Sequence, residues 1–320
     1  MNELAARDCG SVRRSAGWGS TLDFADHVSH PLKEALDCQG SFHHEFRVEY
    51  GKIEAGWTTA CAFFDDAEAI DDFLAYERSY HSHMDDKTCA ALMIIDYCYV
   101  LMFATIPLVA QSGIVPDLAP EQIALRIFTD SQEHDGEMHK VRRADIRYLS
   151  SRFSTDRPAS GRHRDATLLC SREELCDRYR IEIERHLSPL VDGLFKRAGL
   201  ARPALWRLVA DAVAGRWLEV GLLLGQMDQA RADAMRVVKQ AGSPLYNKQL
   251  HFFDLTLHDD HRKPLGSWTF RARGGCCRYY TVVEGALCST CVLKKPETRD
   301  AELLETMRKH VARLAAGQRT

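Results

Sequence analysis

The sequence predicts an α+β protein that is predominantly helical, with N-terminal antiparallel β-hairpins and a small cysteine-containing segment near the C-terminus. Three observations support this. Alternating apolar and polar residues predict strands within residues 42–64 and 123–141. Apolar residues at spacings of three and four predict helices over much of the remaining chain. Finally, four of the 11 cysteines lie within residues 276–291.

The length of 320 residues is enough for about two domains. Residues 151–164 are rich in Ser, Arg and Gly, and this composition predicts a linker or loop. The expected division in chain order is a flexible lead-in (1–20), an N-terminal α+β region (21–150), a helical region (165–262), a cysteine segment (263–299) and a C-terminal helix (300–316).

The first hairpin is expected between residues 42 and 64. Phe42, Phe46, Val48 and Tyr50 keep a period of two, Gly51 and Lys52 supply a turn, and residues 57–64 offer the second strand. His43 and His44 are adjacent on this strand and therefore point to opposite faces, so we assign them no metal.

Two helices are expected next. Asp65 and Asp66 form a helix start, and apolar spacing predicts a helix over residues 67–84. Residues 90–115 are the most hydrophobic run of the chain. Asp96 and Pro107 leave only the ten residues between Tyr97 and Ile106 uninterrupted, which is too short to cross a bilayer. The run therefore predicts a buried core helix.

The remaining elements follow from strand and helix signals. Residues 123–128 predict a strand that pairs with residues 138–141 across a turn at His134-Asp135-Gly136. Ser171 and Glu174 form a capping box for a long helix. We assign no element to the segment that contains His251, His258 and His261. The expected helices are 171–198, 203–224 and 299–316. Residues 222–240 are compatible with a continuation of the second of these helices.

The cysteines near the C-terminus have the unusual spacing C-C-x10-C-x2-C, formed by Cys276, Cys277, Cys288 and Cys291. A C-x2-C pair can turn two thiolates onto one metal ion. Adjacent cysteines in an extended chain point to opposite faces, so a shared centre needs a local kink, which Gly274-Gly275 would permit. Adjacent thiolates suit a two-iron cluster better than one zinc ion, because each iron takes two thiolates.

Two other uses of cysteine were weighed. A structural zinc site with four cysteine ligands remains open. A disulfide framework is disfavoured because the cysteine count is odd and the other seven are scattered. Residues 1–10 contain no apolar run that could serve as a signal peptide. Free thiols without an export signal predict a reducing, cytoplasmic location.

Positive charge gathers around these cysteines. Residues 262–299 contain eight cations against two acidic residues, a local charge of +6 in a chain of net charge −3. A basic surround would favour a negatively charged cluster and attract an anionic ligand or donor. Solvated surface is the alternative. The candidate docking residues are Arg271, Arg273, Arg278 and Lys294.

At this motif the chain resembles the siderophore-iron reductases of the FhuF type, whose C-terminal segment carries the same C-C-x10-C-x2-C arrangement around a [2Fe–2S] cluster. The aromatic pair Tyr279-Tyr280 and the helix opening Ala204-Leu205-Trp206 also resemble the family. Relatives often have proline after the last cysteine, where this chain has Val292, which is not a ligand. The specific motif covers 16 residues.

The resemblance implies that Cys276, Cys277, Cys288 and Cys291 bind a [2Fe–2S] cluster. It further implies a cytoplasmic oxidoreductase, peripheral at the inner face of the membrane, that reduces ferric siderophores and contacts an inner-membrane uptake system transiently. No catalytic residue beyond the cluster is expected.

The partner of such a cluster is expected to be a protein. The sequence contains no flavin, nicotinamide or phosphate-loop fingerprint, so electrons would come from an external donor protein. Two rivals remain: a non-redox binding module stabilised by zinc, and an iron–sulfur sensor. No helix-turn-helix pattern is recognisable, and we expect no nucleic-acid partner.

Overall fold

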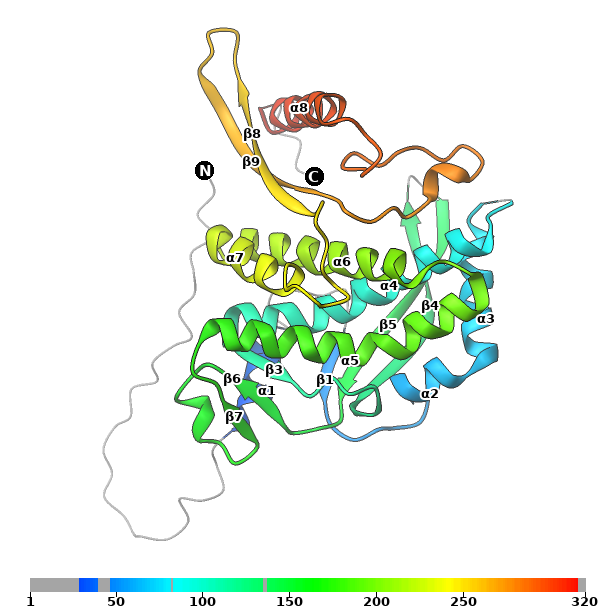
Figure 1. The fold of residues 1–320 in the computed structure, drawn as a ribbon, viewed down its shortest axis with the longest axis vertical. Helices are drawn as coiled ribbons and strands as arrows, with labels where there is room; N and C mark the ends of the chain where they lie inside the picture. The colour runs from blue at the N-terminus through cyan, green and yellow to red at the C-terminus, as the bar shows by residue number, and fades with distance from the viewer. Residues whose placement is uncertain (1–28, 40–46, 82, 135–136, 316–320) are drawn as a thin grey trace.

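The computed structural model describes residues 29–39, 47–81, 83–134 and 137–315. The fold is α+β, with 53% helix, 19% strand and small, mainly antiparallel sheets, as predicted. The expected lead-in (1–20) and residues 42–46 of the expected first strand lie outside the described residues. Figure 1 shows the helices packed beside the main sheet, with a hairpin projecting from this body.

The most apolar helix lies in the centre of the molecule. Helix α4 (Asp86–Pro107) starts at Asp85, whose side chain accepts a 2.7 Å hydrogen bond from the Thr88 amide, and continues into the π-helix η1 (Leu108–Ser112). The stretch Asp86–Ser112 is long and apolar enough to cross a membrane, but 72% of its most apolar window is buried inside the protein. The prediction of a core helix is confirmed.

Helices α5 (Arg172–Ala198) and α6 (Arg202–Leu223) pack against α4, a third helix, α7 (Met227–Val238), packs on both of them, and the ends of these helices follow the predicted signals. In α5 the Ser171 hydroxyl accepts from the Glu174 amide at 3.2 Å, so the capping residue is confirmed. The Glu174 carboxylate returns to the Cys170 amide at 2.8 Å. Helix α6 has its proline in the first turn. Gly225, with φ +65°, separates α6 from α7.

The other helices are shorter or peripheral. The predicted helix after Asp66 is confirmed as α3 (Ala67–Ser79), and the closing helix as α8 (Pro296–Ala315). Helix α1 (Pro31–Gln39) begins at a proline, which tolerates the first turn because its missing N–H has no intrahelical role there. Helix α2 (Ala60–Asp65) occupies most of the expected second strand.

The main sheet has the strand order β1-β5-β4-β2. Its centre is the antiparallel pair β4 (Ile123–His134) and β5 (Glu137–Tyr148), a predicted hairpin that is longer than expected. Strand β1 (Val48–Tyr50) pairs with β5 in parallel, and β2 (Thr58–Thr59) pairs with β4. The predicted hairpin between residues 42 and 64 is therefore wrong. Its two strands lie on opposite edges because each finds its partner in the longer hairpin.

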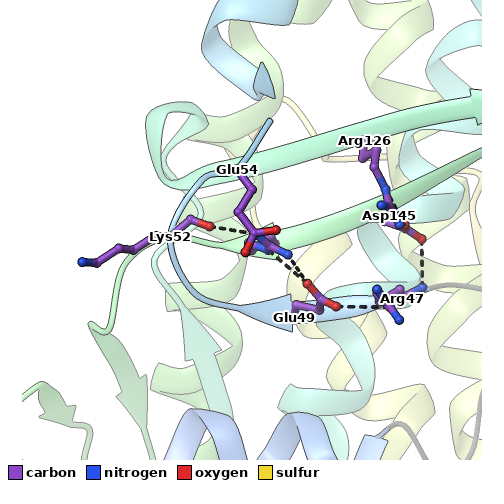
Figure 2. A network of polar contacts seen from close by, with 7 residues as sticks. Arg47, Glu49, Lys52, Glu54, Arg126 and Asp145 are labelled. Carbon is purple, nitrogen blue, oxygen red and sulfur yellow. Dashed lines mark hydrogen bonds and ion pairs between the residues drawn. The ribbon is translucent and has the colours of Figure 1, made fainter. Parts of the chain in front are cut away.

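The buried Arg147 holds β1 and the loop after it against β5. Figure 2 labels its partners Glu49, Lys52 and Glu54. The Arg147 guanidinium donates to Glu49, to the Lys52 carbonyl at 2.8 Å and to Glu54 at 3.1 Å. Its planar group also lies 4.3 Å from the Trp57 ring centroid. Charge-assisted hydrogen bonds and stacking together fix a loop that the short strand alone would hold weakly.

Two smaller sheets complete the fold. Strands β3 (Ile114–Pro116), β6 (Phe153–Thr155) and β7 (Ala166–Leu168) form one, so the expected linker 151–164 contributes to a folded sheet. Strands β8 (His251–His258) and β9 (Pro264–Ala272) form a hairpin that was not predicted. Figure 1 shows this hairpin extending from the body with α8 beside it.

The buried apolar residues of α1 to α7 and the strands form one core, whose largest fully buried side chains include Trp217, Tyr148 and Tyr179. Val282 belongs to this core, and Cys277 and Tyr279 pack against it. The cysteine segment therefore rests directly on the helical body.

Candidate metal centre

The chain that leads from β9 into the cysteines is anchored on α6 by one carboxylate. Asp211, 2% exposed, accepts hydrogen bonds from the Gly274 amide at 3.0 Å and the Gly275 amide at 2.9 Å. Arg273 donates to the same carboxylate at 3.3 Å. A buried charge is stable when it is paired and hydrogen-bonded, and here three donors from three consecutive residues satisfy it. Asp211 thus fixes the approach of the backbone to Cys276.

The two glycines permit close packing. A Cβ atom on Gly275 would lie 2.9 Å from the Arg207 carbonyl carbon, and one on Gly274 would overlap the Asn247 side chain. Neither glycine, both within the described range 137–315, has a positive φ. The left-handed turn occurs at Arg278, with φ 61°, directly after the cysteine pair.

The segment after the cysteine pair is tied to the start of α4. The Arg278 guanidinium donates to Asp85 at 2.6 Å and to the Thr88 hydroxyl at 3.3 Å. The Tyr279 hydroxyl lies 2.8 Å from His81 Nε2. These contacts fix the turn at Arg278 and Tyr279, so Cys277 lines the pocket between α4 and α6.

The C-x2-C half forms a tight turn in which the Cys291 amide donates to the Cys288 carbonyl at 3.0 Å. The thiols of Cys277 and Cys288 are hydrogen-bonded to each other, and Arg273 reaches Cys288 Sγ at 3.4 Å. This hydrogen bond from Cys277, supported by the positive charge of Arg273, lowers the pKa of Cys288 to about 6. The same hydrogen bond and burial raise the pKa of Cys277. The pair therefore shares one proton next to a fixed cation.

Cys288 thus contacts Cys277 through its side chain and Cys291 through its backbone. Cys276 lies next to this group because it directly precedes Cys277. A closed zinc site with Zn–S bonds of about 2.3 Å requires all four sulfur atoms within about 3.8 Å of one another. In the part of the chain that the structure describes, no three of these thiols converge within 4.8 Å. The described thiols therefore do not form a closed single-ion zinc site in this structure.

A pocket of about 290 Å³ opens beside Cys277 and Cys288. Its walls combine apolar side chains of α4 and α6 with Asp211, the two arginines that precede the cysteines, Tyr279 and the two thiols. The residues around it are Leu92, Ile95, Leu208, Asp211, Ala212, Arg271, Arg273, Cys277, Tyr279 and Cys288.

Each of the four predicted docking cations has a partner inside the protein. Arg271 donates to the Asp211 carbonyl, Arg273 contacts Asp211 and Cys288, and Lys294 pairs with Glu302. The side chains of Arg273 and Lys294 are only 13% and 10% exposed, whereas that of Arg278 is 28% exposed. The role of the four cations in docking stays a prediction. Arg273 already contacts Cys288 Sγ inside the protein.

Two features were missed by sequence reasoning. Asp211 had a signal, since it is the only polar residue in the apolar stretch 208–214. The other feature is a group formed by His30, His163 and Asp165, on a different part of the molecule. The spacing His163-x-Asp165 is compatible with metal binding, but the third residue, His30, lies 133 positions before His163. A local sequence pattern cannot indicate a contact over that separation.

Comparisons with protein-family models, with curated proteins and with solved structures find no match.

Proposed function

We propose that this protein is a ferric siderophore reductase whose four cysteines, Cys276, Cys277, Cys288 and Cys291, hold a [2Fe–2S] cluster. One observation carries the proposal: the two halves of the C-C-x10-C-x2-C motif meet, because Cys277 and Cys288 are hydrogen-bonded beside an open pocket. The donor set fits the cluster, with four thiols available and no three of the described ones gathered around a single point.

The reaction is a one-electron step. A [2Fe–2S] cluster supplies one electron at a time. The oxygen ligands of hydroxamate-type siderophores are hard and prefer Fe(III) to Fe(II). One electron from an external donor protein therefore converts the bound Fe(III) to Fe(II), and the weakened chelate releases it. The substrate class is supplied by the resemblance to the FhuF-type family.

The residues of this chain prepare the site for that chemistry. Metal ligation requires deprotonated thiolates, so Cys277 gives up the proton that it shares with Cys288. Arg273 places a positive charge at Cys288 Sγ and favours the thiolate form. Asp211 holds Arg273 and the backbone before Cys276 in position. The apolar walls from α4 and α6 lower the local dielectric, which strengthens these charge effects.

Two rival functions make different demands. A zinc-stabilised binding module requires four converging sulfur atoms, and the spread of the described thiols disfavours it. An iron–sulfur sensor would use the same ligands without turning over a chelate. We propose a cytoplasmic location, because the long apolar helix is buried in the core and the chain carries free cysteines. A transient contact with an uptake system belongs to the same proposal.

The test is anaerobic visible and EPR spectroscopy before and after reduction with dithionite. We expect a coloured protein whose absorption bleaches on reduction and returns when a ferric hydroxamate is added, while Fe(II) appears in a ferrous trap. Cys288→Ser should abolish the spectrum, and the matched control Cys170→Ser, at an exposed thiol, should preserve it. A colourless protein with one equivalent of zinc rejects the cluster. A reduced cluster that persists beside several ferric siderophores rejects the reductase and favours the sensor.

A further inference from the structure

A second group of metal-ligand residues lies far from the cysteines. His30 directly precedes α1, His163 follows the 3₁₀ helix η3 (Ser160–Arg162), and Asp165 directly precedes β7. One ligand atom from each of the three lies within 4.8 Å of the others. Figure 1 shows β7 and the cysteine segment on opposite sides of the helical body. We propose that these three residues bind one divalent first-row transition-metal ion.

The separations match those of ligands around an ion. Asp165 Oδ2 lies 3.5 Å from His30 Nε2 and 3.9 Å from His163 Nδ1. Both distances exceed the usual 2.7–3.2 Å of an N–H···O hydrogen bond. Bonds of about 2.1 Å in a tetrahedral geometry place neighbouring ligand atoms about 3.4 Å apart. The three side chains therefore converge on a common point while standing too far apart for good hydrogen bonds to one another.

An unsatisfied nitrogen faces this point. His30 Nε2 is buried and has no hydrogen-bond partner in the described part of the chain. Leaving a buried polar atom without a hydrogen-bond partner costs about 1–3 kcal/mol of folding free energy, so such an atom in a native structure requires an explanation. A metal ion bound to Nε2 removes that cost. Its side chain is 17% exposed, so the site opens toward solvent and an ion has a path to it.

Neighbouring groups hold the ligands in place before an ion arrives. The His30 ring stacks on Tyr50 with a centroid distance of 5.4 Å and meets Phe153 edge-on at 5.6 Å. On the other side, the Asp165 carbonyl accepts from the Phe153 amide at 3.1 Å. Ligands held by packing and backbone hydrogen bonds lose little entropy on binding, so the site is preorganised.

Each imidazole ring already has one nitrogen in a hydrogen bond. In both imidazole rings Nδ1 accepts a backbone N–H bond at 3.2 Å. An ion on His30 Nε2 leaves the single ring proton on Nδ1, and an ion on His163 Nδ1 takes the lone pair that now accepts the Asp165 amide, so binding breaks both bonds. Because an ion binds only neutral imidazole, binding strengthens as the pH rises.

The ligand set indicates the class of ion. Two imidazoles and one carboxylate suit Zn(II), Fe(II) and Co(II), in contrast to the thiolates of the cysteine site. Three protein ligands leave at least one coordination position open for water or a small ligand. This site does not depend on the proposed reductase function, because it shares no residue with the cysteine segment.

The experiment uses Co(II) and Zn(II) as probes on the full chain. Co(II) bound by nitrogen and oxygen shows d–d bands without the intense near-ultraviolet charge-transfer band of cobalt–thiolate bonds, so the two sites are distinguishable in one titration. We expect one equivalent of thiolate-free Co(II), and Zn(II) that raises the melting temperature by linkage. Asp165→Asn and His163→Ala should each weaken binding by at least about tenfold. His258→Ala, at an exposed position on β8, should leave it unchanged.

Asp165→Asn keeps the size of the side chain and remains decisive if His163→Ala does not fold. The proposal is overturned if no thiolate-free Co(II) binds to the wild-type protein, or if Asp165→Asn binds both ions as tightly as wild type does. These outcomes are independent of the visible spectrum of the cysteine site, so failure of one proposal is distinguishable from failure of the other.

Discussion

Asp211→Asn is the sharpest test of how the cysteine segment is held. Asparagine keeps the shape of the side chain but has one acceptor oxygen, so its amide group must face one of the donors now bonded to the carboxylate, the amides of Gly274 and Gly275 or the Arg273 guanidinium. The substitution also removes the counter-charge of Arg273 from a site that is 2% exposed.

The structure sets the size of the effect. Losing a hydrogen bond to a charged group costs about 1.5–3 kcal/mol, and breaking a buried ion pair costs about 3–5 kcal/mol. The two costs overlap, because both concern one carboxylate. We therefore expect about 3 kcal/mol of local destabilisation, which raises the open population of the segment by roughly 100-fold.

The assay is alkylation of the metal-free protein, followed by mass spectrometry of the peptide that contains Cys277 and of the one that contains Cys288. Both thiols should react far faster in Asp211→Asn than in wild type. The control is Asp192→Asn, because Asp192 is half exposed and pairs with Arg202 on the surface, where an ion pair is worth less than about 1 kcal/mol. Equal alkylation rates in wild type and Asp211→Asn would show that the carboxylate does not anchor the segment.

Three further outcomes are expected. Gly275→Ala should reduce the iron bound per chain, because the added Cβ would lie 2.9 Å from the Arg207 backbone. The control Gly193→Ala, at a glycine with open space around it, should bind as much iron as wild type. Equal iron content in Gly275→Ala and wild type contradicts the prediction. Burial lowers the pKa of His186 to about 4, below its ordinary value of 6.5. As the pH falls, the unfolded state therefore takes up a proton before the folded state does. The free energy of unfolding should drop by about 3 kcal/mol between pH 6.5 and 4. Urea unfolding of His186→Gln should show a smaller drop, and an unchanged slope rejects the assignment. Reversing the charges of Arg278 and Lys294 together should slow siderophore reduction and flatten its salt dependence; wild-type rates and slopes would confine these cations to their internal partners, Asp85 and Glu302.

Local signals predicted the elements whose causes are local. The Ser171 cap, the proline at the start of α6 and the apolar run of α4 each act within a few residues, and each element formed where expected. The strand pattern of residues 48–50 also proved correct, but its partner did not, because pairing depends on the distant β5. The β8–β9 hairpin was missed although Phe253, Leu255 and Leu257 alternate along it.

The same distinction applies to the candidate site. Spacing alone gathered the four cysteines, since a turn at Cys288–Cys291 is a local property. The anchors were beyond reach of that reasoning. Asp211 contacts Gly274 across 63 positions, and His81 contacts Tyr279 across 198. Only the fold shows that such residues are neighbours, and only the fold shows that the cations expected to dock a ligand also have partners inside the protein.

The anchoring of the cysteine segment on α4 and α6 has a consequence for the order of assembly. Asp85, His81 and Asp211 all precede the cysteines in the chain, and their contacts close loops of 63 to 198 residues. Closing a long loop is entropically costly until both ends have been placed, so the helical body must form before the segment can dock on it. The thiols then await metal on a finished surface. The metal-free protein should accordingly keep the body folded and the segment docked by these contacts, so loading the metal should need no refolding of the whole chain.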